Sequence, residues 1–270
     1  MKIDNKLKRV HRAKLPMLSR FTDMSTNKFS NTRRIKEHVG VVTCGSRAYI
    51  LKKHLKSLQN RSFHRELEAY VSYDITSPHI VELVGYRVDV EDKVDAMVLN
   101  YSVECDISGY IRRRYIRDSK LKCKWVAQIV HGLMTIHEAG ITHGDLRCAN
   151  VVLDENLDAR IIDVVQGRAM TPGWSPWKYP AMESPYEPSW DMYSLGASIW
   201  EILSHGEEPS PKEALRFDFY DTNDKGELLL RGIAERCLVD KPGDRPTADI
   251  IFNELGGTNA CGCGWKVLEE

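Results

Sequence analysis

The chain has 270 residues, and its 38 basic and 38 acidic side chains give a formal net charge of zero at pH 7. This length suits one large domain or two joined lobes, and 42% hydrophobic with 28% charged residues exclude collagen-like, low-complexity and wholly disordered chains. The neutral balance predicts no clear nucleic-acid site. Unbroken apolar runs reach only four residues, so no transmembrane segment is expected.

Positive charge gathers in residues 1–36. Eleven Lys and Arg stand there against two acidic residues, a local balance of +9 that leaves −9 for the remaining chain. Such a segment either docks on an acidic partner, anionic lipid or nucleic acid, or is a solvated extension that folds back on the acidic body. We interpret residues 1–34 as a basic N-terminal extension and keep an acidic partner for residues 1–36 as the functional alternative.

The N-terminal residues lack the apolar core of a secretory signal, which favours an intracellular, cytoplasmic protein in a reducing environment. The cysteines are odd in number, have no Cys-x-x-Cys pair, and are expected to be small buried hydrophobes and not disulfides. Cys261 and Cys263 form a close pair that could bind a metal or cross-link, but no second Cys/His pair accompanies them in the sequence. We therefore interpret this pair, like the other cysteines, as structural residues.

Strand patterns follow the basic extension. Apolar alternation over 38–53 predicts two strands joined by a turn at 44–46, and two further strands are expected around 79–88 and 95–101. Between these pairs, residues 62–73 have helical spacing, with Ser62 as a possible N-cap.

Helical patterns dominate from Lys120 onward. Residues 124–140 and 193–206 are amphipathic, and each stretch ends at a glycine that could form a left-handed C-terminal cap. Strands in the first part and helices in the second predict an α+β fold with two lobes joined near residues 100–105.

The stretch with the most chemistry is HGDLRCANVVLDENLDARIID at 143–163, because Asp145, Asn150 and Asp163 recur at a spacing that suits metal-bound phosphate. HGDLRCAN resembles the H-R-D-L-x-x-x-N catalytic loop of protein kinases, and DVV at 163–165 stands where that family has D-F-G. Three further motifs follow in the family's order: AME at 181–183, DMYSLG at 191–196 and DRP at 244–246.

The resemblance covers roughly residues 35–256 and is closest to tyrosine-kinase and tyrosine-kinase-like domains. It implies a bilobal protein-kinase-like fold, with ATP and Mg²⁺ as cofactors and a protein as substrate. The implied parts are a small strand-rich N-lobe at 35–100, a larger helical C-lobe at 101–256 and a C-terminal tail at 257–270.

By this resemblance, Lys52 neutralises the α and β phosphates and Glu66 is its ion-pair partner. Lys53 and Glu68 remain open as alternatives, because each lies close to the preferred residue. Lys52 is preferred because alternation then gives Ile50 the small apolar position that the family places above the adenine. The same matching makes Leu99 the gate residue and places Asn100 and Tyr101 in a hinge, ending at Ser102, whose backbone groups bind adenine.

The second lobe would carry the remaining roles. Asp145 would orient the acceptor hydroxyl and take its proton, and Arg147 would steady the γ-phosphate. Asn150 and Asp163 would hold Mg²⁺ between phosphate oxygens. The resemblance also makes His143 a packed core histidine and pairs Glu183 with Arg245.

Three departures from the family limit these implications. No G-x-G-x-x-G precedes Lys52, where only Gly40 and Gly45 occur, which predicts weakened ATP binding. DVV lacks the Phe and Gly of D-F-G, so Val165 is expected to adopt a conformation that Gly usually adopts. HGD lacks the arginine that binds a phosphorylated activation segment, so control through Thr171, Ser175 or Tyr179 is not expected.

The sequence therefore supports an ATP-dependent protein kinase acting on a Ser/Thr or Tyr hydroxyl. A pseudokinase that binds nucleotide or acts as a scaffold is the alternative, supported by the missing glycine loop and DVV. A small-molecule phosphotransferase ranks third, because HGD also occurs in such kinases while AME, DMYSLG and DRP are typical of the protein-kinase second lobe.

Overall fold

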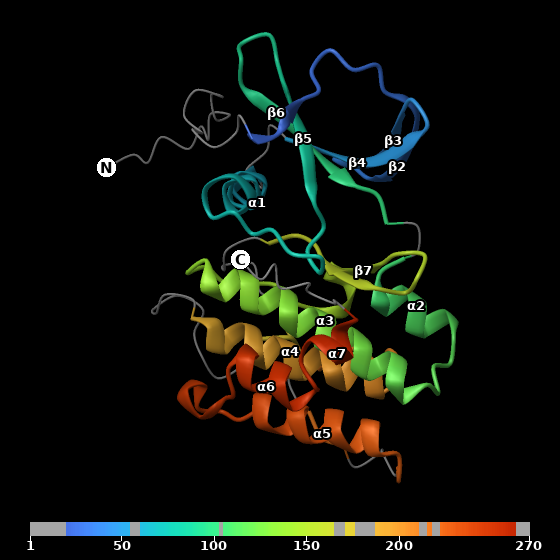
Figure 1. Cartoon of the computed structure of the whole chain (residues 1–270), viewed down its shortest axis with the longest axis vertical. Helices are drawn as coiled ribbons and strands as arrows, with labels where there is room; N and C mark the ends of the chain where they lie inside the picture. Colours follow the sequence, from blue (N-terminus) through green and yellow to red (C-terminus); the bar gives the residue numbers. More distant parts are fainter. Residues whose placement is uncertain are drawn as a thin grey trace, which may run out of the picture. The chain divides into compact units, whose positions relative to one another are not determined.

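The structure is a computed structural model that describes residues 20–54, 60–102, 105–164, 171–175, 187–210, 215–217 and 222–262. The chain divides into two compact units. The N-terminal unit contains residues 1–76 and 81–101, and the C-terminal unit contains residues 77–80 and 102–270. The first is rich in strands and the second is mainly helical (Figure 1), which confirms the predicted α+β bilobal fold.

A six-stranded sheet forms the N-terminal unit, with strand order β1-β5-β6-β4-β3-β2. The short β1 runs parallel to β5, and all the other neighbours are antiparallel. The strands are β1 (Thr22–Asp23), β2 (Ser30–Lys36), β3 (Val39–Cys44), β4 (Arg47–Lys53), β5 (Leu83–Val88) and β6 (Val94–Asn100). The predicted turn at 44–46 joins β3 to β4, and Gly45 has a φ of +61° there. Glycine adopts this left-handed conformation without a Cβ clash.

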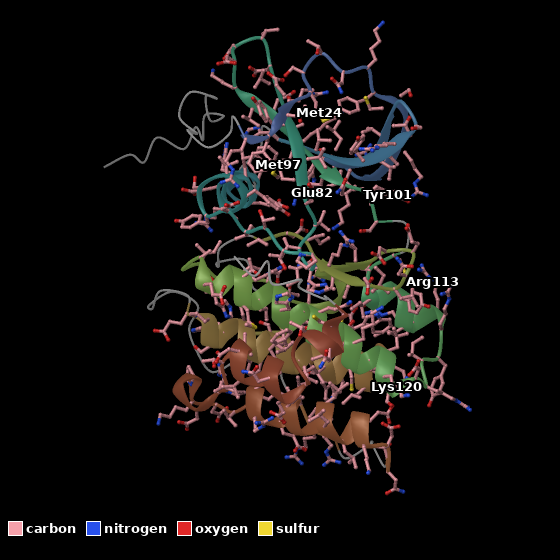
Figure 2. The ribbon with its side chains drawn as sticks, in the orientation of Figure 1. Met24, Glu82, Met97, Tyr101, Arg113 and Lys120 are labelled. Atoms are coloured by element: carbon pink, nitrogen blue, oxygen red, sulfur yellow. The ribbon has the colours of Figure 1, made fainter. Side chains whose placement is uncertain are left out.

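Side chains alternate between the two faces of this sheet, as the period of two requires. One face carries a hydrophobic cluster of buried residues: Met24, Val42, Tyr49, Leu51, Ala96 and Val98. Met24 is one of the side chains labelled in Figure 2. Since Tyr49 and Leu51 belong to that cluster, Lys52 between Leu51 and Lys53 points to the opposite face.

Helix α1 (Asn60–Ser72) supplies the other layer of the N-terminal unit. Phe63, Leu67 and Tyr70 are buried along one side at the spacing of three and four residues, which explains why this segment is helical. The hydroxyl of Tyr70 donates a hydrogen bond to the carbonyl of Val81 at 2.7 Å, which ties α1 to the segment that leads into β5. The helix begins at Asn60, so the prediction of Ser62 as its N-cap was wrong.

Helices form the body of the C-terminal unit. Trp125, Ile129 and Leu133 of α3 are buried, and α4 is buried along nearly its whole length. Each of the two glycines predicted to end these helices has a positive φ, +76° at Gly140 and +95° at Gly206. The elements are α2 (Ile107–Arg113), α3 (Ser119–Glu138), α4 (Pro188–Leu203), α5 (Lys225–Cys237), α6 (Ala248–Glu254), α7 (Thr258–Cys261) and the 3₁₀ turns η3 (Cys148–Asn150) and η4 (Pro242–Asp244).

A two-stranded hairpin, β7 (Val151–Leu153) with β8 (Ala159–Ile161), completes the C-terminal unit. Its turn is closed by the carboxylate of Asp154, which accepts the N–H groups of Asn156 at 2.9 Å and Asp158 at 3.0 Å. The hairpin therefore holds its two open ends, at Asn150 and Ile162, next to each other.

Two features differ from the sequence-based picture. Strands β1 and β2 begin inside residues 1–34, the part interpreted as an extension, so this part contributes to the sheet. Cys261 is disulfide-bonded, although no disulfides were expected. The described cysteines Cys44, Cys105, Cys123, Cys148 and Cys237 are free thiols.

Among the described residues, no helix combines the length and the apolar composition that crossing a membrane requires.

Candidate active site

The N-terminal unit contains a buried ion pair between Lys52 of β4 and Glu66 of α1. Lys52 is 7% exposed and Glu66 is 1% exposed, and the ammonium group donates a hydrogen bond to Glu66 Oε2. Strand register places Lys52 opposite Val39 of β3 and Met97 of β6, the two strands that flank β4 in the sheet. A buried charge is costly unless it is paired, so this pair keeps an ammonium group in place away from bulk water.

The two alternatives left open by the sequence lie elsewhere. Lys53 is exposed at the end of β4, and Glu68 is exposed on α1. Neither can make the buried pair, because strand alternation turns Lys53 to the other face and the helical turn carries Glu68 away from Glu66.

The gate and hinge residues lie at the end of β6. Leu99 is buried and pairs with Ile50 of β4. The amide N–H of Asn100 donates to the carbonyl of Glu82 at 3.0 Å, and its side-chain amide donates to the Glu82 carboxylate. The Tyr101 hydroxyl accepts from Arg33 at 3.4 Å. Glu82 and Tyr101 are labelled in Figure 2. The N–H of Asn100 is thus engaged within its own unit.

A tight turn joins β2 to β3, the strand that pairs with the Lys52-bearing β4. Only Glu37 and His38 lie between the two strands, and Gly40 is already part of β3, opposite Leu51. A two-residue turn offers few backbone N–H groups that could surround phosphates. The segment that lacks the G-x-G-x-x-G motif therefore folds as a short turn and not as a glycine-rich loop.

In the C-terminal unit, Asp145 belongs to a loop that hydrogen bonds hold from inside. The backbone N–H of Asp145 donates to His143 Nδ1 at 3.1 Å, and His143 Nε2 donates to the carbonyl of Ile162 at 2.9 Å. His143 is fully buried. These two bonds define the tautomer of His143 with its proton on Nε2, and they tie the loop to the residue before Asp163.

The buried carboxylate of Asp191, from α4, supports the same loop. It accepts the N–H groups of His143 at 2.7 Å and Gly144 at 2.9 Å, and His137 Nε2 contacts it at 2.9 Å. Burial opposes ionisation of Asp191, but the hydrogen bond and charge of His137 and the N–H of Gly144 outweigh it, so the pKa of Asp191 is lowered. The sequence marked the motif DMYSLG but not this role of its aspartate.

Asn150 and Asp163 come together through the β7–β8 hairpin. The N–H of Ile162 donates to the carbonyl of Asn150 at 3.0 Å, which places the residue before Asp163 beside Asn150. Asn150 is buried, and its amide nitrogen donates to the backbone carbonyl of Asp145 at 2.8 Å and to its carboxylate at 3.2 Å. Because both hydrogens of that amide face Asp145, the oxygen of Asn150 is the atom suited to a cation.

Asp163 has a φ of +61°. A non-glycine residue in the left-handed region costs about 1–3 kcal/mol, and such residues gather at functional sites. Val165, the residue that was expected to show this strain, lies outside the described residues.

The carboxylate of Asp145 has two further neighbours. Thr171 donates to Asp145 Oδ1 through its backbone N–H at 2.9 Å and through its hydroxyl at 2.7 Å. Arg147 Nε lies 3.7 Å from Asp145 Oδ2. From the sequence, Thr171 was interpreted only as a phosphorylation candidate. No sequence signal indicated its contact with Asp145, because the two residues are 26 positions apart.

Arg245 is buried and donates to the carbonyls of Val239, Ser189 and Asp240 at 2.9–3.0 Å. Its guanidinium group also lies 5.1 Å from the centre of the Tyr193 ring. Its predicted partner Glu183 and the phosphorylation candidate Tyr179 lie outside the described residues.

Comparisons with known proteins agree with this geometry. A family model described as "Protein kinase domain" matches residues 45–254. The chain is 27% identical over 226 residues to the serine/threonine-protein kinase Nek6 of Oryza sativa, covering 76% of this chain and 42% of the relative. It is 34% identical over 178 residues to the probable CTD kinase subunit alpha homolog of Encephalitozoon cuniculi, covering 60% and 52%.

The melanoma receptor tyrosine-protein kinase of Xiphophorus maculatus is also similar, at 26% identity over 213 residues, covering 70% of this chain and 18% of the relative. This chain therefore spans about half the length of these relatives, or less. Since the family model matches most of its residues, the chain belongs to the protein kinase family.

Proposed function

We propose that this chain transfers the γ-phosphate of Mg²⁺-bound ATP to a Ser/Thr or Tyr hydroxyl of a protein substrate. The observation that carries the proposal is the buried Lys52–Glu66 ion pair. Hydrophobic residues of the same volume would stabilise the unit as well or better, so a buried ion pair at this position is weak evidence for stability and better evidence for a function.

Phosphoryl transfer needs positioning and charge neutralisation more than covalent chemistry by the protein. In this proposal Lys52 neutralises phosphate oxygens, and Glu66 keeps its ammonium group in place. Asp145 orients the acceptor hydroxyl and takes its proton, and Arg147 steadies the γ-phosphate. Leu99, Asn100 and Tyr101 would surround the adenine, with the Asn100 carbonyl as an acceptor because its N–H is already engaged.

The residues proposed for Mg²⁺ fit a hard cation. Asn150 and Asp163 offer an amide oxygen and a carboxylate, which are the ligands that Mg²⁺ prefers. When bound, the ion would neutralise charge on the phosphate oxygens. The protein would hold these ligand oxygens in place through the β7–β8 hairpin and through the two hydrogen bonds that the Asn150 amide donates to Asp145.

Single-turnover transfer from labelled ATP to a mixed protein pool tests the proposal. Wild type is compared with Asp145→Asn and Asp163→Asn, and the exposed Asp249→Asn is the matched control. Loss of a general base or a metal ligand should reduce transfer by about 10²–10⁴-fold, while the control stays near wild type. Phosphoamino-acid analysis of the product then distinguishes Ser/Thr from Tyr.

Equal transfer at background by all four proteins, each with a normal thermal unfolding transition, would contradict the proposal. That result would favour the second candidate, a nucleotide-binding or scaffolding pseudokinase. The two-residue turn between β2 and β3 favours this candidate, because it leaves few backbone donors for a triphosphate. The acidic partner for residues 1–36 stays a prediction.

A further inference from the structure

Three potential metal ligands that are remote in sequence meet in the C-terminal unit. One ring nitrogen each from His79 and His131 and the sulfur of Cys261 lie within 4.8 Å of one another. They come from the segment before β5, from α3 and from α7. His79 and Cys261 are buried, and His131 is partly buried.

The orientation of His79 is fixed by a backbone carbonyl. Its Nδ1 lies 3.3 Å from the carbonyl oxygen of Ala159, and because a carbonyl can only accept, Nδ1 must carry the proton. The lone pair of this ring is then on Nε2. A histidine whose second nitrogen donates to a carbonyl is the usual arrangement of a metal ligand.

The other two ligands are also held by their surroundings. His131 stacks on Phe252 of α6, with ring centroids 5.0 Å apart and planes inclined by 19°. The side chain of Gln128, one turn earlier on α3, donates to the carbonyl of Cys261 at 3.0 Å and accepts the N–H of Ala159 at 2.7 Å. The same glutamine thus ties Cys261 to the residue that orients His79. A ligand set held on rigid elements loses little freedom when a metal binds.

We propose that His79, His131 and the thiolate of Cys261 form a zinc site that fastens α7 to α3. Two imidazoles with one thiolate are a borderline-soft set that suits Zn²⁺ and not Mg²⁺ or Ca²⁺. With bonds of about 2.0–2.3 Å, tetrahedral zinc ligands lie roughly 3.3–3.8 Å apart, so side-chain shifts of about 1 Å would close this set. A water molecule would supply the fourth ligand. The site is independent of the phosphoryl-transfer residues.

Zinc binding requires reduced Cys261, which is disulfide-bonded in the structure. A phosphine reductant breaks the S–S bond with its electron pair. Water supplies the oxygen of the phosphine oxide and the two protons of the resulting thiols. On binding, the Cys261 thiol passes its proton to the buffer and the thiolate bonds to the metal.

The test uses the full chain, reduced with a phosphine, stripped of metal and titrated with Co²⁺ and then Zn²⁺ under nitrogen. The probe is the sulfur-to-cobalt charge-transfer band, which only a thiolate ligand gives. Wild type should bind one Co²⁺ with this band, and Zn²⁺ should displace it and raise the thermal midpoint. Cys261→Ser should abolish the band, and His131→Asn should weaken binding by at least about 100-fold.

Matched controls are Cys123→Ser, a free thiol elsewhere on α3, and His205→Asn, whose ring stacks on Tyr115 away from the cluster. Both should bind like wild type. The proposal is overturned if reduced wild type gives no thiolate band, or if Cys261→Ser and His131→Asn bind as tightly as the controls. A missing thiolate band in reduced wild type overturns the proposal even if a variant fails to fold.

Discussion

The two units hold their functional residues in different ways. In the N-terminal unit, Lys52 and Glu66 form one ion pair between a strand and a helix. In the C-terminal unit, Asp145 and Asn150 belong to one short loop, and the buried carboxylate of Asp191 supports that loop through two backbone N–H groups. One arrangement is a pairing between a strand and a helix, and the other is a hydrogen-bond network around one loop.

This difference explains why the sequence identifies one unit more sharply than the other. The loop residues are consecutive, so their spacing is preserved in the chain as HGDLRCAN. The ion pair joins residues 14 positions apart on two elements, and its partners are chosen by the register of β4 and the rotation of α1. A motif of consecutive residues can therefore be identified from the sequence alone. For an ion pair between two elements, neighbouring residues such as Lys53 and Glu68 remain as alternative partners.

The largest expected effect tests the Lys52–Glu66 ion pair. Lys52→Met should reduce transfer by about 10²–10³-fold, as for loss of one preorganised charge donor, because the phosphate oxygens lose their ammonium partner. Lys53→Met removes an exposed charge one residue away and should leave transfer near wild type. Single-turnover rates measure both. If the two substitutions had equal effects, the choice of Lys52 would be wrong.

The next effect tests the network. Asp191→Asn offers one acceptor oxygen where two are used, so an N–H of the loop faces an NH₂ group, and the free energy of unfolding at pH 7 should fall by about 3 kcal/mol. Denaturant unfolding measures this loss.

The same variant has a pH signature. Because the pKa of Asp191 is lowered in the folded chain, its stabilising contribution is complete above the unfolded pKa of about 3.9 and is lost as the pH falls through the lower folded value. The difference between wild type and Asp191→Asn should therefore shrink as the pH falls from 5 toward about 3. A constant difference over this range would assign the stabilisation to shape and not to charge.

Two glycine substitutions should have opposite effects in the two units. A Cβ on Gly85 of β5 would meet the backbone oxygen of Thr22 in β1, so Gly85→Ala should destabilise the chain by about 1–3 kcal/mol. A Cβ on Gly232 of α5 has nothing within 4 Å, so Gly232→Ala should stabilise by about 0.5–1 kcal/mol through helix propensity. Thermal unfolding checks both signs. A neutral Gly85→Ala would mean that β1 is not held in the sheet.

The smallest effect concerns the contact from Thr171 to Asp145. Thr171→Val removes the 2.7 Å hydrogen bond from the hydroxyl but keeps the shape of the side chain, which leaves Asp145 Oδ1 more available to a substrate hydroxyl. A bond of about 1 kcal/mol corresponds to a rise in kcat/KM of roughly fivefold. Steady-state kinetics measure it. A fall in kcat would mean instead that Thr171 positions Asp145 for catalysis.

Much of the fold could be predicted because its signals are local. Alternation predicted β3 and β4 and their turn, and apolar periodicity with terminal glycines predicted α3 and α4. Ser62 was wrong as an N-cap because the helix already begins at Asn60, which places Ser62 inside its first turn. Strand β1 was missed because two residues carry no periodicity, and its position depends on pairing with β5 more than 60 residues later.

The sequence by itself determined the protein kinase resemblance and the residues of the Asp145 loop, since ordered motifs and short-range spacing survive in the linear chain. The sequence preferred Lys52 and Glu66 but left Lys53 and Glu68 open, and the tertiary structure shows that Lys52 and Glu66 form the buried pair. Only the tertiary structure brings Thr171 to Asp145. It also joined His79 and His131 to Cys261, a cluster with no spacing signature. The physical reason is that contacts between distant residues depend on how whole helices and strands pack together. The local sequence determines only on which side of its helix or strand each residue lies.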